Sequence, residues 1–200
     1  MTTALTDERT TVERIRTAAM ESLAAQGSAA TTMRGVAAAA GVSLGLVQHH
    51  FTTKAGLIKA VDDYVMSLVI TAMSQPLTDE SVDSIAEIGG RITALIAEQP
   101  DVAAYLGRAL VDGSPFGATF FDTLLALGTS RWHLRVERGE VRPDVDVMWA
   151  AINGLVLALG AISLRTHLER HLAEPLTAPA QLDRWQTATN MLLRDGLFRR

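Results

Sequence analysis

The sequence predicts an all-α protein. Aromatic residues make up only 5% of the 200 residues, whereas alanine, leucine and valine are plentiful, which favours helices over sheets. Apolar residues recur at spacings of three and four along most of the chain. Hydroxyl residues, glycines and prolines stand between these periodic segments, where helices are expected to begin and end.

The first expected helix covers residues 8–26. Apolar side chains recur at every third or fourth position from Val12 to Leu23, which gives this helix one face for burial. Gly27 follows as a C-terminal stop, because glycine readily adopts the left-handed conformation that ends many helices.

Two short helices are expected next, over residues 33–40 and 44–50. Thr31 and Thr32 offer hydroxyl caps to the first of them, and Ser43 caps the second. Gly41 separates the pair, since it can take a left-handed conformation without steric cost.

Longer helices are expected over the rest of the chain. A fourth helix, residues 54–75, ends at Pro76, and the remaining ones end at prolines or glycines. Their expected ranges are 81–99, 102–111, 116–138, 147–172 and 180–198.

The segment 148–164 is uncharged and nearly all apolar, so a membrane span has to be considered. It is shorter than the ~20 residues that usually cross a bilayer, and it contains Asn153. We therefore expect a buried or subunit-interface helix and no membrane partner.

Charge and cysteine content limit the functional classes. The net charge is −4, but the first 60 residues carry six basic and four acidic side chains, so the N-terminal part is mildly basic. The absence of cysteine excludes disulfides and thiolate metal sites. The N-terminus lacks an apolar signal core, so a cytoplasmic location is expected. No metal and no cofactor are expected.

The two short helices and the turn between them have the pattern of a helix-turn-helix unit. Their apolar residues, spaced from Met33 to Phe51, would pack the helices against each other and against the first helix. The second helix would then be exposed for reading the major groove of DNA, with Leu44, Gly45 and Gln48 facing outward.

Gly45 and Gln48 fit that interpretation. Glycine inside a helix costs about 1 kcal/mol relative to alanine, but on the first turn it lets the backbone approach DNA closely. A glutamine side chain offers both a donor and an acceptor to a base edge, with adenine as the usual match. The flanking helix starts and Lys54 would hold phosphates.

Residues 14–65 resemble the N-terminal domain of the TetR family of transcriptional regulators. The matching stretch is TTMRGVAAAAGVSLGLVQHHFTTKAGLIKAV, from Thr31 to Val61, and its most specific part is AGVS-x-G followed by Phe51 and Lys54. The resemblance implies contacts to double-stranded DNA, in which Thr32, Lys54 and His50 hold phosphates. Together with the residues chosen above, the expected DNA-binding set is Thr31, Thr32, Arg34, Ser43, Leu44, Gly45, Leu46, Gln48, His49, His50 and Lys54.

The resemblance also implies two domains and a dimer. A helix-turn-helix domain would cover residues 1–53, and an effector-binding and dimerisation domain would cover 54–200, with 54–75 as the connecting helix. The segments 147–172 and 180–198 match the helices that form a four-helix bundle between two protomers of this family. Two recognition helices would then lie one DNA turn apart, ~34–36 Å, on a near-palindromic operator.

The expected effector is small and largely apolar. Its candidate ligands combine apolar bulk with occasional polarity on central helices: Tyr105, Phe116, Phe120, Phe121, Trp149 and Asn153. Ordinary core packing remains the alternative for each of them, and Asn153 could equally bond across a dimer. Three arginines at 131, 135 and 138 are expected to form a salt-bridged surface stripe.

No catalytic residue is expected. The chain contains no GxSxG, no GxxxxGK[ST] and no GxGxxG motif. The sequence thus predicts a ligand-responsive DNA-binding regulator, more often a repressor in this family. The alternative is an all-helical small-molecule binding protein or enzyme whose N-terminal hairpin is only structural.

Overall fold

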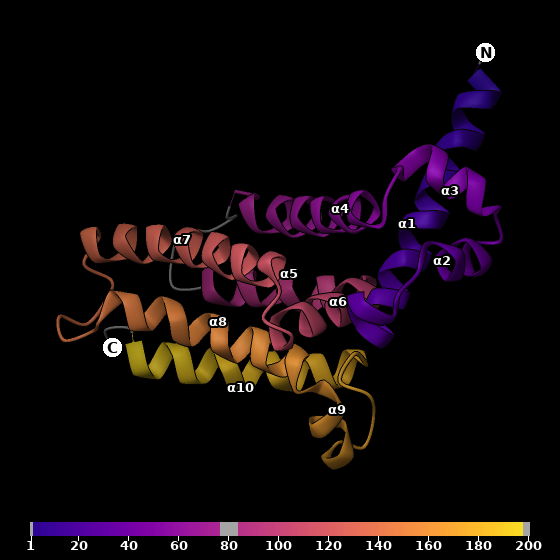
Figure 1. Cartoon of the computed structure of the whole chain (residues 1–200). Coiled ribbons are helices and arrows are strands. Elements are labelled where there is room, and N and C mark those ends of the chain that lie inside the picture. The colour runs from indigo at the N-terminus through magenta and orange to yellow at the C-terminus, as the bar shows by residue number, and fades with distance from the viewer. Residues whose placement is uncertain (1, 77–83, 198–200) are drawn as a thin grey trace.

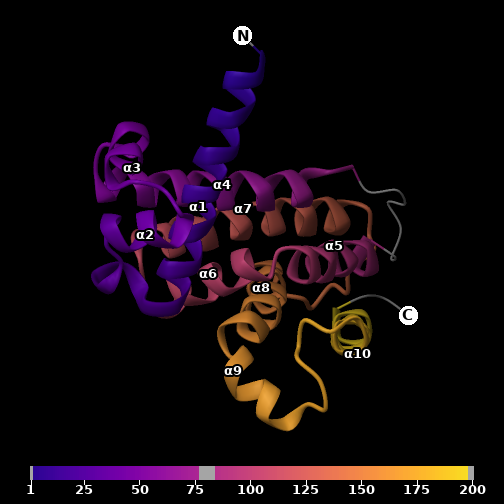
Figure 2. The ribbon, with the colours of Figure 1, turned by 90° about the vertical axis from the view of Figure 1, so that its right-hand side faces the viewer.

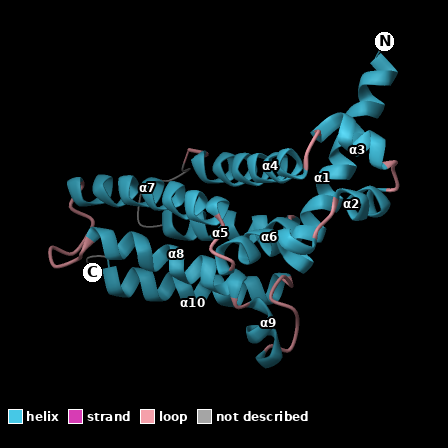
Figure 3. Ribbon diagram, viewed as in Figure 1, coloured by secondary structure: helices cyan, strands magenta, loops and turns pink. Residues whose placement is uncertain are grey.

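The computed structural model describes residues 2–76 and 84–197, and every regular element in those two stretches is a helix (Figure 3). The predicted all-α class is therefore confirmed. The helices are α1 (Thr2–Ala30), α2 (Met33–Ala40), α3 (Leu44–Phe51), α4 (Lys54–Ser74), α5 (Ser84–Glu98), α6 (Pro100–Val111), α7 (Pro115–Glu137), α8 (Val147–Ser163), α9 (Arg165–Leu168) and α10 (Pro179–Leu197), with a 3₁₀ turn, η1 (Glu169–His171).

Helices α1, α2 and α3 gather at one end of the molecule and form a head, and α4 extends from them over the other helices (Figure 1). The body consists of α5 to α8 and α10, and α8 packs against both α6 and α7. Helix α6 also packs against α1, so it joins body and head. After a quarter turn, α9 projects away from the rest of the chain (Figure 2).

Helix α1 is longer than expected at its start and kinked near its end. It begins at Thr2 rather than at residue 8, because residues 2–7 contain no glycine or proline that would stop it. Gly27 has φ 75° and ψ 173°, a conformation outside the helical region that suits glycine, so the predicted stop is a kink followed by one more turn. A Cβ at Gly27 would lie 2.8 Å from Nη2 of Arg108, so this side chain of α6 lies beside the kink.

One apolar cluster runs through head and body. It contains Ile15 of α1, Val36 of α2, Val47 of α3, Leu57 of α4 and Phe120 of α7, all of which are buried. The head is therefore not held to the body by a linker alone. Its position depends on a core that both parts share.

The expected helix 147–172 is wrong in its second half. Helix α8 ends at Ser163, and the chain bends by 69° into α9 and η1. The apolar face that packs on α6 ends near Ile162, and the residues that follow are mostly exposed, so nothing holds them along the same axis. A carboxylate oxygen of Glu169 accepts a hydrogen bond from the Leu176 amide at 3.0 Å, which secures the bend.

Other boundaries differ by one or two residues. Pro100 does not merely end α5; it opens α6 at the first helical position, where its missing N–H is harmless. Ser114 caps α7, since its hydroxyl accepts a hydrogen bond from the Gly117 amide at 3.0 Å. The expected starts and ends at residues 81 and 198 lie outside the described residues.

Within residues 2–76 and 84–197, no single helix is both long enough and apolar enough to cross a bilayer. The bent pair of Val147–Ser163 and Arg165–His171 passes the same length and composition test only when its two parts are taken together.

We expect Gly56→Ala to lower the free energy of unfolding by about 1–3 kcal/mol, the usual range for overpacking. A Cβ at Gly56 would lie 2.5 Å from the carbonyl oxygen of Phe51, and a backbone atom cannot move aside as a side chain can. Urea unfolding measures the change. Gly90→Ala on α5 is the control, because its Cβ would meet only Nε2 of Gln186 at 3.7 Å, and a loss of stability as large as that of Gly56→Ala would contradict the steric explanation.

Candidate nucleic-acid interface

The turn between α2 and α3 is built by local hydrogen bonds. Gly41 ends α2 in the left-handed conformation, and its N–H donates to the carbonyls of Ala37 and Ala38. Arg14 of α1 donates from Nη2 to the Ala40 carbonyl at 2.6 Å, which ties the end of α2 to the first helix. The two helices are thus fixed relative to each other and to α1.

Hydroxyl groups cap the starts of α2, α3 and α4. The side chains of Thr32, Ser43 and Thr53 accept hydrogen bonds from the amides three residues further on, at 3.0, 3.2 and 3.0 Å. The caps predicted at Thr32 and Ser43 are present. All three residues are exposed, so three helix N-termini with their amide groups lie at the surface of this region.

Helix α3 presents a mixed surface. Gly45, Gln48 and His49 are exposed, whereas Val47 is buried in the core. Leu44 was expected to face outward, but it is half-buried and packs against the apolar cluster, because the short helix uses it to anchor its first turn. Leu46 and His50 are also half-buried.

Neither the backbone conformation nor the packing around position 45 requires a glycine there. Among the described residues, the only atom within 4 Å of a Cβ built at this position is Oγ of Ser43, at 3.9 Å, an ordinary van der Waals distance. Its φ is not positive, so an alanine would meet neither strain nor a clash within the described chain. The absence of a side chain here leaves the backbone of α3 open to whatever approaches it.

Two of the residues expected to contact DNA make hydrogen bonds within the chain. Thr31 is only 2% exposed, and its hydroxyl donates to the Gly27 carbonyl at 2.9 Å, so it stabilises the end of α1 and does not face outward. Lys54 is half-buried, and its Nζ donates to the Ser28 carbonyl at 2.5 Å. Arg34 is exposed on α2.

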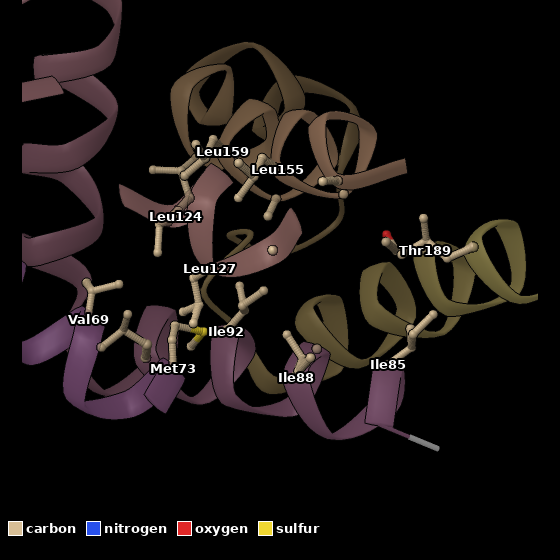
Figure 4. Close-up of a pocket in the computed structure, with 18 of the residues that line it drawn as sticks. Val69, Met73, Ile85, Ile88, Ile92, Leu124, Leu127, Leu155, Leu159 and Thr189 are labelled. Carbon is tan, nitrogen blue, oxygen red and sulfur yellow. The ribbon is translucent and has the colours of Figure 1, made fainter. Parts of the chain in front are cut away.

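A cavity of about 190 Å³ lies in the body. Helices α4, α5, α6, α7, α8 and α10 contribute to its wall, for example through Val69, Ile92, Leu124, Leu155 and Thr189 (Figure 4). Of the six side chains proposed for an effector, only Phe120 lines it.

The other five lie elsewhere. Tyr105 is buried and stacks on Phe116 with ring centroids 5.7 Å apart, and Phe121 packs against the same core. Trp149 is 59% exposed and Asn153 is exposed, so both lie on the outer face of α8. Large aromatic side chains in the sequence did not identify the cavity lining, because most of the cavity wall is aliphatic.

The expectation of a solvated arginine stripe on α7 is wrong for two of its three members. Arg135 is only 7% exposed and Arg131 is half-buried, and both line the cavity, whereas Arg138 is exposed. Arg131 donates a hydrogen bond from Nη2 to the Met73 carbonyl of α4. The four-residue spacing of these two arginines was the available signal, since it places them on the same helix face as Leu124 and Leu127.

A buried hydrogen bond joins α6 to α4. The hydroxyl of Tyr105 donates to Oδ1 of Asp62 at 2.5 Å. Burial raises the pKa of Asp62 above its usual value, and the bond from Tyr105 offsets part of this effect. The same surroundings raise the pKa of Tyr105, so its hydroxyl remains a donor.

The fold and this surface define a class: an all-helical protein with an N-terminal helix-turn-helix head on a helical body that holds a cavity. Residues 15–61 match the family described as "Bacterial regulatory proteins, tetR family". The chain is 31% identical over 134 residues to the HTH-type transcriptional regulatory protein RaaS of Mycobacterium tuberculosis, covering 66% of this chain and 60% of that protein. The N-terminal head, residues 15–61, is thus that of the tetR family of bacterial regulatory proteins.

Further similarities agree with this assignment. The chain is 32% identical over 100 residues to the HTH-type transcriptional repressor Rv3405c of Mycobacterium tuberculosis, covering 50% of this chain and 46% of that protein. It therefore matches less than two thirds of the length of either relative. The crystal structure of a TetR transcriptional regulator from Chloroflexus aurantiacus has the same fold, with a TM-score of 0.74, 20% identity, and coverage of 97% of this chain and 99% of that one.

We expect Asp62→Asn to raise the free energy of unfolding at pH 7. Since burial raises the pKa of Asp62, the folded chain favours the protonated carboxyl, and the stability it contributes is lost as the pH rises through that pKa. Asparagine stays neutral and still accepts the Tyr105 hydrogen bond. The difference from the wild type should shrink as the pH falls below the ordinary value of 3.8.

Chemical unfolding across this pH range is the measurement. The adjacent Asp63 is exposed and pairs with Lys59, so Asp63→Asn should change stability by no more than about 0.5 kcal/mol. An Asp62→Asn protein that is less stable than the wild type at pH 7 would show that the charged hydrogen bond outweighs the burial of the carboxylate.

Proposed function

We propose that this protein binds double-stranded DNA as a dimer and represses transcription until a small effector releases it from a near-palindromic operator. The observation that carries the proposal is the surface of α3, where an exposed Gly45 leaves the backbone bare beside an exposed Gln48. The match of the head to the tetR family gives this surface a ready interpretation as the recognition helix.

The proposed DNA contacts combine base reading with phosphate binding. Gln48 offers a donor and an acceptor to a base edge, and the bare backbone at Gly45 allows α3 to enter the major groove closely. The N-termini of α2 and α4 present amides suited to phosphate, with Arg34 and His49 exposed nearby. Thr31 is left out of this set because its hydroxyl bonds within the chain.

A dimer is proposed through α8 and α10. Trp149, Asn153, Val156 and Gly160 recur along one face of α8 at spacings of three and four, and Val156 is 56% exposed. Met191 and Leu192 on α10 are exposed as well. Apolar side chains of this size in solvent favour association, and Gly160 has no atom within 4 Å of a built Cβ, which leaves room for a partner helix.

The cavity is the proposed effector site, and α6 is the proposed route from it to the head. Val102 and Leu106 of α6 line the cavity, and the same helix packs on α1 and bonds to α4 through Tyr105. An effector that shifts α6 would move α4 and change the spacing of the two heads. Such coupling is reciprocal, so operator DNA should weaken effector binding by the same factor.

Gly45→Ala separates folding from DNA binding. We expect its free energy of unfolding to stay the same or rise by up to about 1 kcal/mol, because alanine is the better helix former and meets no atom of the chain. Its affinity for the operator should fall about tenfold or more, a loss of ~1.4 kcal/mol or more, because the added methyl group would lie between α3 and the base edges. Operator sites selected from random DNA and a fluorescence-anisotropy titration give the measurement.

Two further variants complete that experiment. Gly90→Ala, a helical glycine on α5, should leave DNA affinity unchanged. Gln48→Ala should relax the preference at one base pair by about 1–3 kcal/mol while non-specific binding at low salt remains. If the wild type bound no DNA even at low salt, the proposal would be wrong and the head would be purely structural.

Val156→Asp should convert the dimer to a monomer at micromolar concentrations, because it would place an unpaired carboxylate in the proposed interface. Val111→Asp is a matched control, since Val111 is 67% exposed, lies at the end of α6 and belongs to neither helix of the proposed interface. Sedimentation velocity reports the oligomeric state. A wild-type monomer, or the same behaviour for both variants, would rule out this interface.

A further inference from the structure

The wall of the cavity is apolar for most of its length and cationic at one place. Ile88, Ile92, Leu124 and Leu155 represent the aliphatic part, and Arg131 and Arg135 supply the charge. On α7 the cavity reaches from Phe120 to these arginines. Phe120 and Arg131 are about 16 Å apart along the helix axis, at the rise of an α-helix.

Arg131 carries a charge that no described carboxylate balances. Its only hydrogen bond within the described residues goes to the Met73 carbonyl, although a guanidinium has five N–H donors. The charged group that acts on it is another cation, Arg91. Arg91 is itself occupied by Glu87 at 2.6 Å and by the carbonyls of Gln75 and Pro76 at 2.7 Å.

Arg135 differs from Arg131 because a nearby carboxylate partly balances its positive charge. Glu140 interacts with it favourably, and its guanidinium lies 5.0 Å from the ring centroid of Trp132. Arg131 and Arg138 act on it unfavourably. The cavity wall formed by the two arginines therefore has a positive potential, and Arg131 is its less compensated member.

Burial lowers the pKa of both arginines, because the charged guanidinium is removed from water. An anion placed beside Arg131 would offset that unfavourable burial. A neutral ligand would leave it unchanged, and a cation would add repulsion.

We propose that the cavity binds a single-chain amphipathic anion, whose carboxylate pairs with Arg131 and whose aliphatic tail lies along α5, α7 and α8. The binding of this anion does not depend on the proposed function. Only its role as the effector rests on that function, because the cavity is the effector site proposed above. The far end of the tail would lie near Val102 and Leu106 of α6. Because α6 packs against the head, a longer tail reaches the helix that positions α1.

Calorimetric titration of the full chain without DNA tests the head group. Octanoate, 1-octanol and octylammonium share one tail and differ in charge. Octanoate should bind at least tenfold more tightly than octanol, and octylammonium should bind more weakly than both. Equal or tighter binding of octanol or octylammonium would overturn the proposal, and so would the absence of octanoate binding.

A chain-length series tests the tail. Affinity should rise about fourfold for each added methylene from hexanoate to decanoate, the increment expected for burying one CH₂. Affinities that do not change with chain length would overturn the assignment of the tail to the aliphatic wall.

Variants of Arg131 test its pairing. Arg131→Gln keeps a donor for the Met73 carbonyl but removes the charge, so octanoate affinity should fall roughly ten- to a hundredfold, as for the loss of a charged hydrogen bond. Octanol affinity should change less than about threefold, and Arg131→Lys should keep most of the carboxylate preference. Arg138→Gln removes a neighbouring charge outside the cavity lining and should leave octanoate binding within about twofold.

The outcomes separate this inference from the proposed function. If Arg131→Gln bound octanoate as the wild type does, the anion site would be wrong, whatever the DNA titrations show. If octanoate binding followed the predicted pattern but no DNA were bound, the ligand class would stand and the regulatory function would fall. The head-group series on the wild type decides the matter even where an Arg131 variant does not fold.

Discussion

The packing of α6 between α1 and α8 is the constraint on which the rest of the structure depends. The kink of α1 at Gly27 lies beside this helix, since a Cβ built there would be 2.8 Å from the guanidinium of Arg108. One apolar cluster then runs from Ile15 and Val36 in the head to Val102 and Phe120 in the body. Cores that are close-packed transmit displacement, so a change in the position of α6 is felt in both parts.

Two contacts make that transmission specific. The side chain of Tyr105 bonds to Asp62 of α4, and Arg108 touches the kink in α1. Both residues lie on α6, within two positions of Leu106, which lines the cavity. Helix α4 lines the cavity itself through Val69 and Met73, and α6 lies between the cavity and α1. This arrangement needs no long pathway of coupled residues, only two positions of α6 that a ligand stabilises differently.

The helix-turn-helix head could be predicted from the sequence because its determinants are local. Caps at Thr32 and Ser43 act over three residues, and the glycine at 41 ends a helix by its own conformation. The cavity could not be predicted in this way, since six helices, from α4 to α10, form its wall. Aromatic side chains were chosen for it, yet Tyr105 and Phe116 stack on each other in the core and Trp149 lies in solvent.

The two arginines were missed for a related reason. Arginines spaced by four residues on a helix usually form a solvated face, and the exposed Arg138 follows that rule. Whether Arg131 and Arg135 do so depends on what packs against α7. That is chiefly α8, together with the end of α4, where the Met73 carbonyl accepts from Arg131. The bend after α8 is also non-local, because it occurs where contact with α6 ends rather than at a glycine or proline.

Gly45 and Arg131 share a physical feature that distinguishes them from the residues that only hold the fold. An alanine at 45 would suit the helix better, and an apolar side chain at 131 would suit the cavity better. Each position departs from the choice that would favour the folded chain alone, and each lies at a surface or cavity that something else can enter. Departures of this kind are expected at functional sites, where an external partner supplies the missing interaction. For Gly45 the proposed partner is the edge of the DNA groove, and for Arg131 the proposed partner is an anion, so binding should stabilise the folded protein at both places by linkage.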